Sequence, residues 1–168
     1  MRSLPVLFAL CSTIAVGCAP RATPENPRYR IAVLEDQRAA ASAELAGLTR
    51  HPDPAIRARA VLAVARIQDP ADLGVLLEAQ SDASDEVAQL AVWGIGQLGL
   101  AVGNRVPDAA VEGVATWLAD DRPSRVATAV EALGKLATTH AETAVLSVAD
   151  APAAEVRAAV ADALFRLR

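Results

Sequence analysis

The chain has 168 residues, enough for one domain with a substantial hydrophobic core. Its residues are 53% hydrophobic but only 3% aromatic, and alanine dominates, a composition that favours closely packed helices over strands. The formal net charge of −4 is mild, and the sequence has no basic stripe with interleaved aromatic residues, so we expect no nucleic-acid partner.

The first 17 residues have the features of a secretory signal peptide, which we assign to 1–17. Arg2 supplies the positive start, and the apolar run Leu4–Val16 is too short to span a bilayer comfortably. The run closes on Ala-Val-Gly-Cys at 15–18, which resembles a bacterial lipobox, with Ala15 where Leu is usual. The resemblance implies cleavage before Cys18 and attachment of lipid to its thiol. The alternatives are an ordinary secreted protein cleaved nearby and a retained anchor helix.

Residues 18–29 are predicted to form the lipidated cysteine and a proline-rich tether, because prolines block helix formation and favour an extended spacer. Cys11 lies inside the predicted signal, so the mature chain keeps only Cys18 and can form no internal disulfide. By resemblance to Gram-negative lipoproteins, Ala19 after the cysteine favours an outer-membrane anchor facing the periplasm. We therefore expect a bacterial envelope protein held to the membrane by its N-terminal lipid.

Four later segments share one pattern of apolar and small residues, and their closing apolar residues are spaced 31, 38 and 31 residues apart. The shared positions fall on one face of a helix. In the third segment Arg125 stands where an apolar residue belongs. We expect the helix start to shift by one residue to Val126, and the alternative is that Arg125 turns out of the core. The four segments are Ile56–Ile67, Val87–Leu98, Arg125–Leu136 and Val156–Leu167.

A looser helix is expected before each of these segments, so that each unit is a helical hairpin. The longer middle interval predicts an extended loop over Gly99–Asp108, with Gly99 as the helix stop. Asp53 and Asp69, each followed by proline, are expected to cap helix starts, and Thr139 with Glu142 forms a predicted capping box. The four expected first helices are Ile31–Leu48, Ala71–Gln80, Ala109–Ala119 and Ala141–Val148.

The stretches 53–67 and 87–98 resemble the short bacterial HEAT repeat, and the HEAT-like repeat of phycobilin lyases is similar. The resemblance covers about residues 31–168, and we assign 30–168 to the repeat domain. It implies an all-α fold, a short α-α superhelix (solenoid) of about four HEAT-type hairpins. Because this fold serves many purposes, the resemblance says little about function.

Residues for catalysis are few, and we expect no catalytic residue, no metal and no cofactor. His51 and His140 are expected in solvated turns and do not match the His-Glu pairs of metal-binding HEAT hydroxylases. Three acidic pairs are expected at or near helix starts, where negative charge complements the backbone dipole. Gly94, Gly96 and Gly99 have the letters of a dinucleotide fingerprint without a preceding strand, so we assign the first two to helix–helix contact. The acidic pairs are Glu35-Asp36, Asp85-Glu86 and Asp120-Asp121.

A partner-binding face follows from the helix positions that point away from the core. They predict a concave groove with an apolar centre and arginines at its edge. Trp93 is the candidate anchor, because an exposed Trp on such a face often dominates binding. The alternative is that Trp93 packs under the 99–108 loop, whereas Trp117 is expected in the core. The six predicted partner-binding residues are Trp93, Leu62, Leu90, Arg59, Arg66 and Gln97.

The last segment, Ala161–Arg168, is a repeat helix without the polar cap that usually closes a solenoid. We expect its exposed side to be covered by a partner, by self-association or by further sequence. Our leading hypothesis is a lipid-anchored envelope scaffold that binds a protein and is not an enzyme. The alternative is an accessory or regulatory part of an envelope enzyme, lyase-like or associated with a prolyl isomerase, within a longer protein.

Overall fold

The computed structural model describes residues 26–39, 42–105 and 107–167. The described residues form helices and no strand. Three short 3-10 turns join the helices: η1 (Pro70–Asp72), η2 (Gly103–Arg105) and η3 (Thr116–Ala119). The α-helices are α1 (Pro27–Asp36), α2 (Ala43–Leu48), α3 (Pro54–Ile67), α4 (Leu73–Ala79), α5 (Asp85–Val102), α6 (Asp108–Ala115), α7 (Pro123–Leu136), α8 (Thr139–Leu146) and α9 (Ala154–Arg166).

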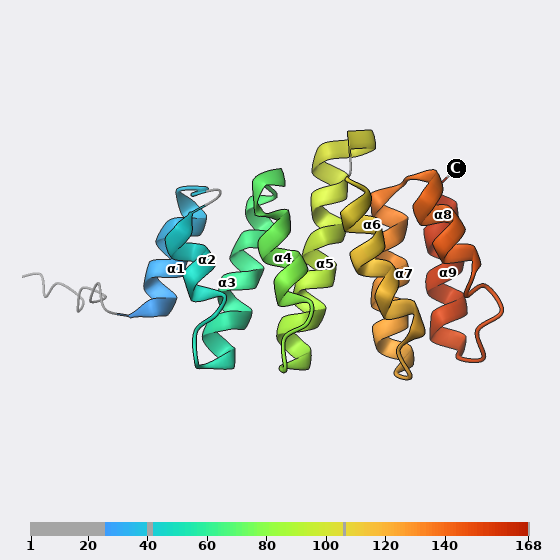
Figure 1. Cartoon of the computed structure of the whole chain (residues 1–168), viewed down its shortest axis with the longest axis horizontal. Helices are drawn as coiled ribbons and strands as arrows, with labels where there is room; N and C mark the ends of the chain where they lie inside the picture. Colours follow the sequence, from blue (N-terminus) through green and yellow to red (C-terminus); the bar gives the residue numbers. More distant parts are fainter. Residues whose placement is uncertain (1–25, 40–41, 106, 168) are drawn as a thin grey trace, which may run out of the picture.

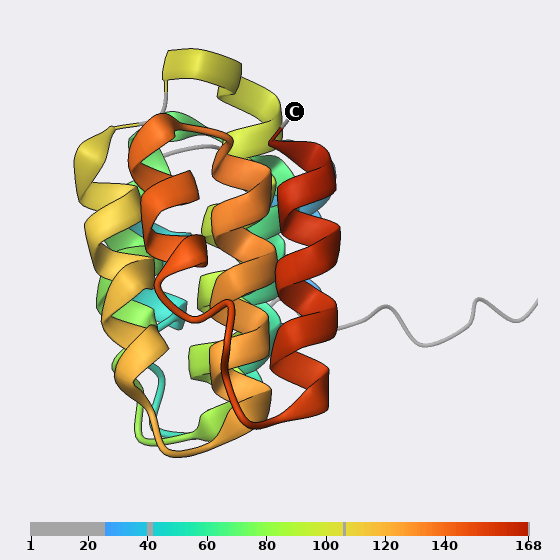
Figure 2. The same cartoon turned by 90° about the vertical axis from the view of Figure 1, so that its right-hand side faces the viewer.

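The helices stand in two rows, as Figures 1 and 2 show. In the first row, α1, α3, α5, α7 and α9 pack side by side in chain order. In the second row, α2, α4, α6 and α8 alternate with them, and α4 contacts α6 as α6 contacts α8. This is a solenoid of helical hairpins, so the predicted all-α superhelix is confirmed.

The four segments predicted from the repeat are α3, α5, α7 and α9, and three of the four expected preceding helices are also present. The exception is 31–48, which is two helices and not one. The break follows from Arg38, whose φ of 47° is left-handed, and from Ser42, whose side chain caps α2 by accepting from the Leu45 amide. As a result α1 belongs to the first row, where it packs on α3 as a half unit ahead of the first hairpin.

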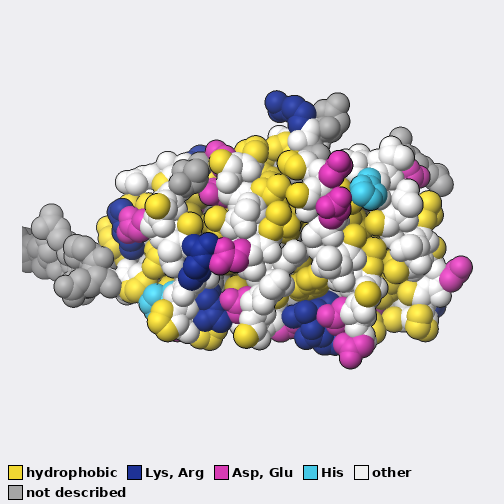
Figure 3. Space-filling view, viewed as in Figure 1, with side chains coloured by type: hydrophobic (Ala, Val, Ile, Leu, Met, Phe, Trp, Pro, Cys, Tyr) yellow, Lys and Arg dark blue, Asp and Glu magenta, His cyan; other side chains and the backbone are white. Residues whose placement is uncertain are grey.

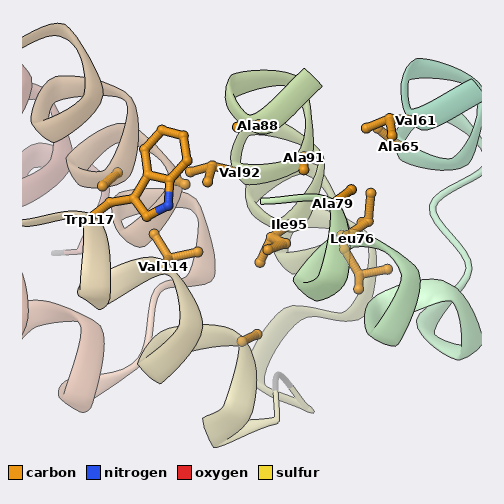
Figure 4. Close-up of a cluster of buried hydrophobic side chains, with 14 of the residues drawn as sticks. Val61, Ala65, Leu76, Ala79, Ala88, Ala91, Val92, Ile95, Val114 and Trp117 are labelled. Carbon is orange, nitrogen blue, oxygen red and sulfur yellow. The ribbon is translucent and has the colours of Figure 1, made fainter. Parts of the chain in front are cut away.

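The core is built mainly from alanine, valine and leucine, which allow the rows to approach closely. Figure 4 shows one part of it, where Val92 and Ile95 of α5 point toward Val114 and Trp117 of the second row. Trp117 is 6% exposed, which confirms its predicted place in the core. Burial on this scale is the main stabilising term for such a fold, at about 25 cal/mol for each Å² of apolar surface removed from water.

Glycines mark the points of closest contact between first-row helices. A Cβ atom at Gly94 would lie 2.7 Å from the Ala65 Cβ atom on α3, and one at Gly96 would lie 2.9 Å from the Ala132 Cα atom on α7. The role predicted for these two glycines is confirmed. The prediction for Gly99 is wrong: α5 runs on to Val102, and Gly99 faces Leu136 of α7 because only a residue without a side chain fits there. The extended loop is correspondingly shorter than predicted.

Helix starts follow the expected cap chemistry, with one difference. Asp53 and Asp69 cap the starts of α3 and η1 by accepting from the backbone amides two residues later, at 2.9 and 2.8 Å. The cap of α8 is Thr138 and not Thr139: the Thr138 hydroxyl accepts from the Ala141 amide at 3.1 Å. Glu142 is therefore one position too late to close a capping box on this residue.

In the third segment the structure shows which residue takes the core position where Arg125 interrupts the pattern. Val126 is buried at 7% exposure, so the core position does shift by one residue. The Arg125 guanidinium carbon lies over the Trp117 ring, 4.3 Å from its centroid, and the Arg125 side chain is 16% exposed. Its nitrogens donate to Asp85 at 2.6 Å and to Asp120 at 3.2 Å.

Candidate protein-binding face

The six predicted partner-binding residues lie on two neighbouring helices of the first row. Three come from α3 and three from α5, and these helices pack against each other. We call this set the binding face. Five of its side chains are half-buried, and one is exposed, with a side-chain exposure of 54%. The half-buried members are Arg59, Leu62, Leu90, Trp93 and Gln97, and the exposed member is Arg66.

Trp93 borders a hollow of about 320 Å³ between α5 and α7. Leu90 lines the hollow from the same helix, and Thr128 lines it from α7. Arg105 and Pro107 of the α5–α6 connection lie elsewhere, around a separate hollow near Pro70 and Leu73. Trp93 is half-buried and packs against the core, and its predicted role as a binding anchor stays a prediction.

The arginines of the binding face are already engaged within the chain. Arg59 and Arg66 both donate to the Glu35 carboxylate of α1, Arg66 at 3.2 Å. Burial would raise the pKa of Glu35, but the hydrogen bonds from the two arginines outweigh it and lower the pKa. One guanidinium nitrogen of Arg59, Nη1, is buried without a hydrogen-bond partner in the described part of the chain. These arginines tie α1 to α3, so the positive edge predicted for the groove is neutralised.

The carboxylate of this cluster lies at the opposite end of its helix from the predicted place. Glu35 and Asp36 were expected near a helix start, but they end α1. The repeat itself contained the missing signal, since Glu35 and Arg66 are 31 residues apart, which is one repeat length. Residues one repeat apart lie at equivalent places on neighbouring helices and so can meet.

Two further carboxylates border this face, although neither is among the six predicted partner-binding residues. Glu86 of α5 and Glu131 of α7 line the hollow beside Trp93, together with Gln89. Both are exposed, and among the described residues neither lies within ion-pair distance of a basic group. A second hollow of about 150 Å³ follows between α7 and α9, where Lys135 and Arg166 accompany Asp162. Burial lowers the pKa of Lys135, which the nearby Glu131 carboxylate opposes.

The opposite side of the molecule, formed by the second row, has a different character. Figure 3 shows acidic and basic side chains lying next to one another there, among scattered hydrophobic ones. Arg50 bonds Glu78 across neighbouring hairpins, and Arg57 bonds Asp82 at 2.7 and 2.8 Å. The hydrogen bond from Arg57 lowers the pKa of Asp82 more than burial raises it. These pairs join successive hairpins of the repeat stack.

An apolar hollow of about 430 Å³ lies at the turns between the third and fourth hairpins. It was not predicted. Leu118, Val126, Val148 and Val156 line it, with Asp150 among the polar residues. Farther along, Phe165 on α9 is 82% exposed, and the predicted self-association through this helix stays a prediction.

The candidate residues for chemistry lie apart from one another. His51 sits in the turn before α3, where its Nδ1 atom accepts from the Asp53 amide at 3.1 Å, and His140 is exposed at the start of α8. The described residues contain no group of three or more His, Cys, Asp or Glu placed to hold a metal ion. Cys18 and the predicted signal and tether up to residue 25 lie outside the described residues. Among the helices that the structure describes, none is long and apolar enough to cross a membrane.

The first part of the chain is similar to a known repeat family. Residues 22–96 match the family model for HEAT repeats. Among solved structures, human deoxyhypusine hydroxylase in complex with glycerol is similar at 19% identity over 83% of this chain and 77% of that one, with a TM-score of 0.36. A search of curated proteins gives no significant match. Residues 22–96 are thus similar to HEAT repeats, and the described residues form a stack of helical hairpins.

Proposed function

We propose that this chain is a lipid-anchored scaffold of the bacterial cell envelope, which binds a protein partner through the binding face on α3 and α5. The observation that carries the binding role is the position of Trp93. Its ring is half-buried beside an open hollow, with Leu90 next to it. Large aromatic side chains in such settings supply much of the binding energy at protein interfaces.

The surrounding structure suits a binding surface. The helices under the face are held by close glycine contacts on both sides of α5, at Gly94 against α3 and at Gly96 against α7. Arg59 is held to Glu35 of α1 on the N-terminal side. A face fixed in this way binds without a large cost in ordering its own side chains. We propose no catalytic step for the chain.

The anchor is the second part of the proposal and rests on the sequence. The apolar run ends at Gly17-Cys18, and the proline-rich tether follows. We propose that Cys18 carries the lipid, and that the tether holds the repeat domain away from the bilayer at roughly 3 Å per residue. In a Gram-negative cell the domain would then face the periplasm from the outer membrane.

Site-specific photo-crosslinking tests the binding role directly. A photoreactive amino acid at position 97, on the binding face, should crosslink one discrete partner in intact cells. The same group at position 112, which is exposed on α6 of the second row, is the matched control and should give none. Equal crosslinking from both positions, or none from position 97, would show that α5 does not present the partner-binding face.

Metabolic labelling with an alkyne-tagged palmitate tests the anchor. The native chain should be labelled and should sediment with membranes, and Cys18→Ser should lose the label and the membrane association. A Cys11→Ser variant is the control, because Cys11 lies inside the predicted signal. Unchanged membrane association of Cys18→Ser would contradict the lipid anchor.

A further inference from the structure

The hollow beside Trp93 combines an aromatic ring with two carboxylates. Trp93 and Leu90 supply its apolar wall from α5, and Glu86 of α5 and Glu131 of α7 also line it. Thr128 adds a hydroxyl from α7. The volume of about 320 Å³ is near the lower limit for a small-molecule pocket, so it has room for a single long side chain.

The same combination occurs elsewhere in the chain with its cation in place. Arg125 lies over the Trp117 ring at 4.3 Å and bonds Asp85 and Asp120, so one tryptophan and two carboxylates hold one guanidinium. The hydrogen bond from Arg125 is the largest cause that lowers the pKa of Asp85. At the Trp93 hollow the tryptophan and both carboxylates are present, and no described arginine or lysine lies within 4.0 Å of either carboxylate.

Basic groups on the surrounding helices are engaged elsewhere. Arg122 and Arg125 bond Asp85, the residue before Glu86. Arg59 and Arg66 are bound to Glu35 on the far side of α3 from α5. Lys135 lines the next hollow, which Glu131 also borders together with Asp162 and Arg166, and Lys135 does not lie within 4.0 Å of the Glu131 carboxylate. The Trp93 hollow is therefore the part of the face with a net negative charge and an open aromatic ring.

We propose that this hollow receives a lysine or arginine side chain from an extended basic segment of the protein partner. The cation lies against the Trp93 ring and between the Glu86 and Glu131 carboxylates, where cation–π attraction and charge pairing act together. Its methylene stem packs on Leu90, as long basic side chains do when only their heads stay hydrated. This proposal rests on the binding role proposed above and specifies the chemistry of the partner.

Fluorescence titration of Trp93 tests this chemistry. In the full chain carrying Trp117→Phe, Trp93 is the single tryptophan, since the sequence has two. Three synthetic peptides of equal length are added, one rich in lysine and arginine, one rich in glutamate and one neutral. The basic peptide should change the Trp93 emission saturably, and its affinity should fall as salt is raised from 50 to about 300 mM, because salt screens the charge pairing. The other two peptides should leave the emission unchanged.

Matched variants test whether the basic peptide binds at the Glu86 and Glu131 carboxylates. Glu86→Gln and Glu131→Gln should each weaken the basic peptide about fivefold, the size of one partly exposed charge pair. Glu112→Gln, on the second row, should leave the affinity unchanged. Circular dichroism confirms that each variant is folded. Equal binding of the acidic or neutral peptide, or affinity untouched by both face variants, would overturn the proposal.

The two proposals fail in distinguishable ways. Crosslinking from position 97 together with no response to the basic peptide leaves the binding face intact and rejects the basic segment. Binding of an acidic or apolar peptide at Trp93 would identify a partner of that other chemistry and also reject it. Absence of crosslinking from position 97 rejects the binding face itself, whatever the peptides do.

Discussion

At the scale of single residues, the turns after first-row helices carry an unusual backbone conformation. Arg38, Gln68 and Ala137 have positive φ angles of 47°, 58° and 52°, a region where glycine is the usual choice. Arg38 and Gln68 also form side-chain hydrogen bonds to the next first-row helix. Arg38 donates to the Ile67 carbonyl at 2.5 Å, and Gln68 donates to the Gln97 carbonyl at 3.0 Å, each on the next first-row helix. Arg38 and Gln68 therefore link successive repeats, which a glycine could not do because it has no side chain.

A pair of glycine substitutions tests this explanation. Ala137→Gly should raise the free energy of unfolding by about 0.5–1 kcal/mol, because alanine has no side-chain bond to lose and its left-handed conformation is costly. Gln68→Gly should give no gain, since the bond to Gln97 is lost with the side chain. Denaturant unfolding of the two variants measures both values. A larger gain at Gln68 than at Ala137 would show that the side-chain bond contributes little.

Truncation of Trp117 should cost the stability expected of a core residue. Trp117→Ala should lower the free energy of unfolding by about 3–5 kcal/mol, because the ring is 6% exposed and leaves a cavity under Arg125. Trp117→Phe should retain most of that stability and serves as the conservative control. Thermal unfolding followed by circular dichroism at 222 nm compares them. Stability that is insensitive to Trp117→Ala would mean that the ring is not part of the core.

At the scale of helices, the repeat works because small residues stand where first-row helices touch. A Cβ atom at Gly134 of α7 would lie 2.8 Å from both the Cα and Cβ atoms of Ala163 on α9. Gly96 faces Ala132 in the same way one unit earlier. The spacing between helices is therefore set by backbone contact, and an added methyl group on this line must push the helices apart.

Replacing two glycines by alanine distinguishes the cost of steric overlap between helices from the gain in helix propensity. Gly134→Ala should cost about 1–3 kcal/mol of stability through this overlap, although alanine favours helices. Gly74→Ala, in α4, has open space around its Cβ position and should gain up to about 1 kcal/mol. Denaturant unfolding of both variants gives the two signs. A stabilising Gly134→Ala would contradict the close contact between α7 and α9.

The sequence predicted the helices α3, α5, α7 and α9, but it did not predict the role of Gly99 or the break after α1, for a physical reason. The spacing of Ile56, Val87 and Val156 directly encodes which side of a helix is buried, and the structure buries all three. The role of Gly99 depended on Leu136, a residue far along the chain, which no local pattern reveals. The break after α1 depended on a single left-handed residue, Arg38.

In the predicted binding face, too, local periodicity predicted some features and missed those that depend on other helices. Helical periodicity placed Leu90 and Trp93 on the side away from the core, and the structure puts both beside a hollow. Periodicity gave no information on charge partners, so Arg59 and Arg66 were expected at an open edge, whereas both bond Glu35. Glu131 is the equivalent of Trp93 one repeat later, so the repeat spacing places the two on the neighbouring helices α5 and α7.

At the scale of the whole molecule, arginine–carboxylate pairs connect units along the stack. Glu35, Asp82 and Asp85 each have a pKa lowered by hydrogen bonds from arginines on other helices, although burial acts in the opposite direction on all three. A lowered pKa means that ionisation favours the folded state. The stabilisation is complete above the unfolded carboxyl pKa of about 4 and is lost as the pH falls through the lower folded values.

We therefore expect the repeat stack to lose stability in acid. The melting temperature should be nearly constant from pH 7 to about pH 5 and should fall steadily below pH 4. Arg57→Met removes the bonded partner of Asp82 and should flatten this fall while lowering stability at pH 7. Thermal unfolding across the pH range, in buffers of equal ionic strength, provides the measurement. A melting temperature independent of pH between 5 and 3 would be inconsistent with this role of the pairs.

The central claim is that Trp93 belongs to a partner-binding surface and not to the structural core, and Trp93→Ala tests it most directly. The full chain and the variant are compared for thermal unfolding and for recovery of the partner that crosslinks from position 97, with Leu146→Ala as an exposed control on α8. We expect the variant to lose about 1 kcal/mol of stability or less and to recover no partner. A large loss of stability, or partner recovery equal to that of the native chain, would contradict the claim.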